Sequence, residues 1–97
     1  MKRAMKPIHP GAILREDVLK PYNLTITDAA HDLQISRKQL SEIVNEKSSI
    51  TTEMAIRFEQ VFKIAASFWL DLQRDFDLWK IKESGKIHLK PLTSLRA

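Results

Sequence analysis

The 97-residue sequence contains no cysteine, which excludes disulfides, thiolate zinc sites and cysteine nucleophiles. It contains only two glycines, and they form no glycine-rich loop that could cradle a phosphate group. No hydrophobic run approaches the roughly 18 residues of a membrane-spanning helix, and the basic start lacks the apolar core of a signal peptide. We therefore expect a single cytoplasmic domain that uses no cofactor and binds no membrane.

The formal net charge of +4 is a property of the two ends of the chain. Residues 1–9 and 84–97 hold no acid and six basic residues, Lys2, Arg3, Lys6, Lys86, Lys90 and Arg96. Residues 10–83 hold the other ten basic residues and all twelve acids, so this central part has a net charge of −2. Overall basicity therefore does not identify a nucleic-acid-binding protein, and the local placement of charge has to decide.

Two capped helical patterns fill residues 25–45, TITDAAHDLQISRKQLSEIVN. Thr25 with Asp28, and Ser36 with Gln39, match the signal in which side chains satisfy the free N–H groups of a helix's first turn. Apolar residues recur on one side of each pattern, Ala29, Ala30 and Leu33 in the first and Leu40, Ile43 and Val44 in the second. Because alanine is small, the two helices can approach closely. The stretch predicts a helix-turn-helix.

The second helix of this pair has a polar face opposite its apolar side. Side chains on this face have the size and chemistry to contact base edges and phosphates in a major groove. We therefore predict that this helix reads DNA. The predicted DNA-binding residues, which include both helix caps and the lysine just after the second helix, are Thr25, Ser36, Arg37, Lys38, Ser41, Glu42, Asn45 and Lys47.

Three further helices complete the predicted fold. His9-Pro10-Gly11 begins the first helix, which Pro21 ends. Thr51 is predicted to cap the fourth helix, whose expected buried stripe is Met54, Ala55, Phe58, Val61 and Phe62. Ser67 is predicted to cap a fifth helix that runs to about Glu83. The fold class is all-α with five helices.

The predicted fifth helix carries more apolar surface than one face needs. Trp69, Leu72, Phe76 and Trp79 follow one another at helical spacing, which is typical of a core-facing stripe. A second apolar patch, at Leu70, Leu78 and Ile81, belongs either to the core or to a subunit contact. We predict that it forms the interface of a homodimer, because a two-fold dimer supplies a second DNA half-site.

The ends of the chain are expected to lie outside the folded domain, which we place at residues 9–83. Residues 1–8 are predicted to form a flexible basic arm, which is either a solvated tail or a phosphate or minor-groove contact. Residues 84–97 contain Gly85, Pro91 and no helical periodicity, so we predict a flexible tail.

The chain resembles the HigA (VapI) family of antitoxins, within the larger Xre, lambda-repressor-like class. The matching stretches are HPGAILRE at 9–16, the Thr25–Asn45 unit, ITTEMAIRF at 50–58 and SFWLDLQRDFDLW at 67–79. The helix-turn-helix alone indicates only the broad class, whereas the outer motifs are more specific to the family. The resemblance implies a dimeric bacterial protein that binds a double-stranded DNA operator, represses its own operon and neutralises a HigB-like toxin that cleaves mRNA.

The sequence departs from this family at Gln34, where the turn between the two helices usually has glycine. Glycine is favoured there because it adopts a left-handed backbone at little cost, while other residues lose roughly 1 kcal/mol or more. Gln34 therefore either adopts the left-handed conformation under strain or accompanies a remodelled turn.

Two other functions compete with the antitoxin hypothesis. A stand-alone repressor of the same fold, without a toxin, fits the same residues. An enzyme has little support, because no nucleophile is paired with a base. His9, His31 and His88 are far apart in sequence, so we predict solvent-facing or capping roles for them and not metal binding.

Overall fold

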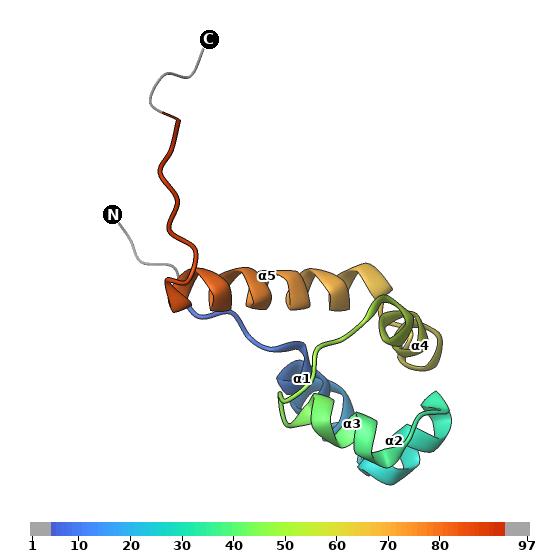
Figure 1. The fold of residues 1–97 in the computed structure, drawn as a ribbon. Helices are drawn as coiled ribbons and strands as arrows, with labels where there is room; N and C mark the ends of the chain where they lie inside the picture. Colours follow the sequence, from blue (N-terminus) through green and yellow to red (C-terminus); the bar gives the residue numbers. More distant parts are fainter. Residues whose placement is uncertain (1–4, 93–97) are drawn as a thin grey trace.

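The computed structural model describes residues 5–92, and its regular structure is entirely helical (Figure 1). The helices are α1 (Pro10–Ile13), η1 (Leu14–Leu19), α2 (Ile26–Leu33), α3 (Arg37–Val44), α4 (Thr52–Phe62) and α5 (Ala66–Ser84). The π-helical segment η1 follows α1 without a break, so the two form one first helix. The predicted all-α fold with five helices is confirmed. None of the described helices combines the length and the apolar character that crossing a membrane requires.

The long helix α5 lies along one edge of the molecule, and the pair α2 and α3 lies at the opposite edge (Figure 1). The first helix lies between them, and α4 lies near the N-terminal end of α5. The helix pairs that pack against each other include α4 with α5, α2 with α3, and α1 with both α3 and α5. The helix-turn-helix is therefore supported by α1, which packs against α3, and by α4, which packs against α2; α5 packs in turn against α1 and α4.

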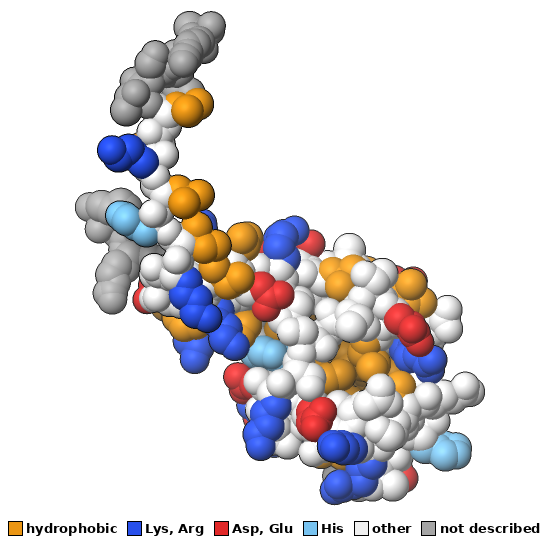
Figure 2. Space-filling view, viewed as in Figure 1, with side chains coloured by type: hydrophobic (Ala, Val, Ile, Leu, Met, Phe, Trp, Pro, Cys, Tyr) orange, Lys and Arg blue, Asp and Glu red, His pale blue; other side chains and the backbone are white. Residues whose placement is uncertain are grey.

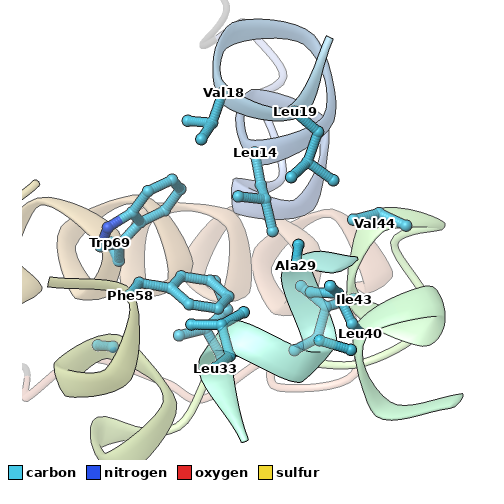
Figure 3. Close-up of a cluster of buried hydrophobic side chains, with 13 residues drawn as sticks. Leu14, Val18, Leu19, Ala29, Leu33, Leu40, Ile43, Val44, Phe58 and Trp69 are labelled. Atoms are coloured by element: carbon cyan, nitrogen blue, oxygen red, sulfur yellow. The ribbon is translucent and has the colours of Figure 1, made fainter. Parts of the chain in front are cut away.

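One core joins all of these helices (Figure 3). Phe58 of α4 and Trp69 of α5 are fully buried, and their rings meet edge to face with centroids 5.1 Å apart. The predicted apolar faces of α2 and α3 are buried in this core. The stripe predicted for α4 is correct except at Val61, which is exposed. Val61 lies where α4 ends and lines an open groove there, together with Tyr22 and Ile64.

Three of the four predicted helix caps are present. Thr25 Oγ1 accepts from the Asp28 N–H at 3.0 Å, and Thr51 Oγ1 accepts from the Met54 N–H at 3.2 Å. Ser36 and Gln39 form the full reciprocal pair, with both hydrogen bonds at 3.0 Å.

The cap predicted at Ser67 is wrong, because α5 begins at Ala66 and its N-cap position is Ala65, two residues before Ser67. The Ala66 N–H donates to the Glu59 carboxylate at 2.6 Å. A side chain from α4 therefore satisfies the start of α5, and no hydroxyl cap is needed.

The ends of the described chain have no regular structure. Lys2 and Arg3 of the predicted arm lie outside the described residues, while the ammonium group of Lys6 lies 5.5 Å from the ring centre of Trp79. Residues 86–92 are exposed and follow a left-handed Gly85 at the end of α5. The proposed boundaries of the folded domain, at residues 9 and 83, stay predictions.

Gln34 adopts the left-handed conformation, with φ 58° and ψ 45°. The turn between α2 and α3 therefore keeps a left-handed residue and is not remodelled. The Arg57 guanidinium donates to the carbonyl groups of Leu33 at 2.8 Å and of Gln34 at 3.3 Å, and Glu53 holds the same guanidinium at 2.9 Å. These contacts satisfy carbonyl groups that the end of α2 leaves free.

We predict that Gln34→Gly raises the free energy of unfolding by about 1 kcal/mol, because glycine adopts this backbone conformation without strain. Urea unfolding followed by tryptophan fluorescence measures the change. A midpoint that is unchanged or lower would show that the turn holds Gln34 without strain.

Candidate nucleic-acid interface

The N-terminal end of α3 is fixed on two sides. Ser36 and Gln39 cap its first turn, and a cap of this kind contributes about 1 kcal/mol to helix stability. On the buried side, Leu40, Ile43 and Val44 anchor the helix in the core. Arg37 and Lys38 consequently project from a rigid first turn into solvent.

Arg37 is oriented by the neighbouring helix. Its Nε donates to Thr27 Oγ1 in the first turn of α2 at 3.1 Å. The sequence reasoning missed Thr27; the available signal was its position two residues after the Thr25 cap, on the polar side of α2. This contact reduces the freedom of a long side chain and holds the guanidinium at the junction of the two helices.

Three cations of this region have no acidic partner within 4.0 Å among residues 5–92: Arg37, Lys38 and Lys47. By contrast, Arg15, Lys20, Arg57 and Arg74 all form ion pairs with acids of the described chain. Other exposed lysines of the described chain also lack an ion pair, namely Lys6, Lys63, Lys80, Lys82, Lys86 and Lys90. Lys and Arg side chains accordingly lie over several parts of the face that Figure 2 shows, including the edge formed by α2 and α3. What distinguishes Arg37, Lys38 and Lys47 is their position in the first turn of α3 and in the loop after it. Unpaired cations of this kind are the groups that contact phosphates and guanine edges.

The other predicted DNA-binding residues have partners within the protein. Thr25 and Ser36 use a hydroxyl lone pair in their caps, and each keeps its O–H for donation. Asn45 Nδ2 donates to the Ser41 carbonyl at 2.9 Å, which closes the last turn of α3. Glu42 is half-buried and accepts from the Ser48 hydroxyl at 3.3 Å. Glu42 and Asn45 are thus placed to shape the end of α3 and the loop after it.

The first helix holds the C-terminal end of α3 by direct contact. A Cβ atom added to Gly11 would lie 1.8 Å from the Ile43 carbonyl oxygen, so only glycine allows this approach. Arg15 Nη1 donates to the Val44 carbonyl, and its Nη2 lies 3.5 Å from Glu46 Oε2. Hydrogen bonding with Glu16 raises the pKa of Arg15, so this guanidinium stays charged. Gly11 and Arg15 therefore position the helix without belonging to its exposed face.

Comparisons with known proteins bear on this arrangement. A helix-turn-helix family model matches residues 16–69, a span that contains α2, α3 and α4. The chain belongs to the helix-turn-helix family. An HTH-type transcriptional regulator of Haemophilus influenzae is 43% identical over 84% of this chain and 76% of its own length. Virulence-associated protein I of Dichelobacter nodosus is 41% identical over 88% of this chain and 78% of its own length.

A solved structure shows the same helix-turn-helix fold on DNA. The Pseudomonas aeruginosa antitoxin HigA, determined with the higBA promoter, matches this chain with a TM-score of 0.81 and 32% sequence identity. The match covers 89% of this chain and 98% of that one. These relatives confirm the resemblance to HigA and VapI. This helix-turn-helix protein is a DNA-binding regulator of a non-enzymatic family.

We predict that Gly11→Ala lowers the free energy of unfolding by about 2–3 kcal/mol, because the added methyl group meets a backbone carbonyl group and forces α1 away from α3. Chemical denaturation measures the loss. Ala12→Gly is the matched control: it alters the neighbouring position, where no such clash arises, and should cost only about 1 kcal/mol through helix propensity. Equal losses in the two variants would contradict the proposed close contact.

Proposed function

We propose that this chain is an antitoxin that binds its own operator through α3 as a homodimer and neutralises a HigB-like toxin that cleaves mRNA. The observation that carries the DNA half of the proposal is the set of unpaired cations beside α3, on a helix that its cap and core contacts hold rigid. The toxin half is supported by the similarity to the HigA antitoxin.

The proposed DNA contacts divide by chemistry. Arg37 and Lys38 lie in the first turn of α3, where a reading helix reaches the base edges. Lys47 follows the helix and fits a phosphate contact. The N-terminal end of α2, beside Thr25, adds the positive end of a helix dipole, which also favours phosphate.

The dimer contact is proposed on α5. Leu78 and Ile81 are each 51% exposed, and with Leu70 they line a groove that Ile87 borders. Leu70 itself is half-buried and packs against the core, so it links the groove to the interior. A two-fold dimer that binds two adjacent half-sites needs its two reading helices about 34–36 Å apart, and an interface on α5 leaves α3 at the opposite edge free for DNA.

A stand-alone repressor is the second candidate. It is favoured by the similarity to the Haemophilus influenzae protein, whose name describes an uncharacterised HTH-type transcriptional regulator. Expression together with the product of the neighbouring gene separates the two functions. A stable complex and rescue of growth support the antitoxin, whereas DNA binding without either result supports the repressor.

The role of α3 can be tested with single alanine variants. Arg37→Ala should weaken binding to a duplex from upstream of the chain's own gene by about 1–3 kcal/mol, through loss of a base contact. Lys38→Ala should weaken all duplexes alike and reduce the salt dependence by about one unit, through loss of a phosphate contact. Fluorescence anisotropy with specific and scrambled DNA distinguishes these effects. Lys63→Ala, an exposed lysine at the end of α4, serves as the control.

Binding at full affinity by the Arg37→Ala/Lys38→Ala double variant would refute α3 as the reading helix. Stability should change by less than about 0.5 kcal/mol in either single variant, because both side chains are exposed.

The proposed dimer interface can be tested by placing negative charges on it. Leu78→Asp and Ile81→Asp should give a folded monomer with weakened DNA binding, because a buried unpaired carboxylate opposes association. Analytical ultracentrifugation measures the change, and Leu89→Asp in the exposed tail is the control. A wild-type protein that is monomeric at micromolar concentration would rule out the proposed interface.

A further inference from the structure

His9 is a buried histidine at a junction of three segments. Its Nδ1 accepts from the Gly11 N–H at 2.9 Å and so caps the start of α1. Its ring meets the ring of Phe76 on α5 edge to face, with centroids 4.9 Å apart. A backbone hydrogen bond links it to Ser48, in the loop after α3. One side chain thus contacts the first helix, the last helix and the segment that leaves the reading helix.

The same junction fastens the C-terminal end of α3. Gly11, the residue that His9 caps, lies against the Ile43 carbonyl group of α3. On the other side of the loop, Gln73 of α5 accepts from the Ile50 N–H at 2.8 Å. The position of α3 relative to α1 and α5 therefore depends on contacts that His9 helps to hold.

The contact with Gly11 requires a neutral imidazole. An acceptor at Nδ1 places the ring proton on Nε2, and protonation of Nδ1 would set two N–H groups against each other. Burial lowers the pKa of His9 below 6.5, and nearby Lys80 acts in the same direction. The Glu46 and Asp77 carboxylates and the Ser48 hydrogen bond oppose this effect without cancelling it. The ring is therefore neutral at pH 7.

We propose that His9 is a positioning residue for α3 whose protonation makes DNA binding by this chain sensitive to acid, an inference that rests on the proposed role of α3. The direction of the pH dependence follows from the difference in proton binding between the folded and the unfolded chain. Between the lowered pKa of His9 and 6.5, the unfolded chain binds a proton that the folded chain excludes, so stability falls as the pH falls. At pH 5.5 this one group lowers the ratio of folded to unfolded protein by at most about tenfold.

The experiment compares wild type with His9→Asn and His31→Asn at pH 7.5 and pH 5.5. Asparagine is a strong N-cap that does not titrate, so His9→Asn keeps an acceptor for Gly11. His31 is exposed on α2, which makes His31→Asn the matched control. Each protein is unfolded in urea without DNA and is titrated with a duplex selected from a random library at pH 7.5. If His9→Asn does not fold, His9→Ser provides a shorter cap.

We expect acid to lower the folded-to-unfolded ratio in wild type and in His31→Asn by up to about tenfold beyond any change seen in His9→Asn. Below its lowered pKa the folded His9 takes up a proton and loses the Gly11 contact, so we also expect a loss of DNA affinity in wild type and in His31→Asn that His9→Asn does not show. The same acid response in His9→Asn as in wild type would overturn the proposal. An acid response of stability with unchanged DNA affinity would also overturn it, because His9 would then be only structural. Absence of DNA binding by wild type at pH 7.5 would instead refute the proposed role of α3 and with it this inference. The urea series would still report the titration of His9 separately.

Discussion

The orientation of α3 depends on a backbone contact with no room for a side chain. Gly11 of α1 lies directly against the Ile43 carbonyl group, and the other contacts that α1 makes with the C-terminal end of α3 depend on this approach. Arg15 reaches the last turn of α3 because α1 is so close, and His9 caps the same turn of α1 that makes the contact. A helix held at both ends in this way can present its exposed side chains in one geometry.

The arginines that support the fold and the cations beside α3 differ in whether they have an acidic partner. Acidic side chains neutralise most of the arginines that support the fold, as Glu53 does for Arg57 behind the helix-turn-helix. Cations beside α3 are left unpaired within the described residues. A central region with a net charge of −2 can therefore still offer a positive surface to DNA.

Local signals in the sequence predicted the helix-turn-helix well, because caps and apolar periodicity act within a few residues. The Ser36–Gln39 pair and the left-handed option at Gln34 are examples. Contacts between distant residues were not predictable in this way. Glu59 takes the place of the expected Ser67 cap by accepting from Ala66, seven residues away in the sequence. Arg15 donates to the Val44 carbonyl group, twenty-nine residues away. Neither partner has a local pattern that marks it, since only the packing of the helices brings them together.

We propose that α3 reads DNA while α1 and α4 hold the helix-turn-helix in place and α5 packs behind both of them. Amide chemical-shift mapping of the ¹⁵N-labelled protein, titrated with its operator duplex, tests this claim most directly. We expect the largest shifts at residues 36–41, with further shifts at the start of α2 and at Lys47. Shifts concentrated on α5 or on residues 86–92, with those of α3 unchanged, would contradict it.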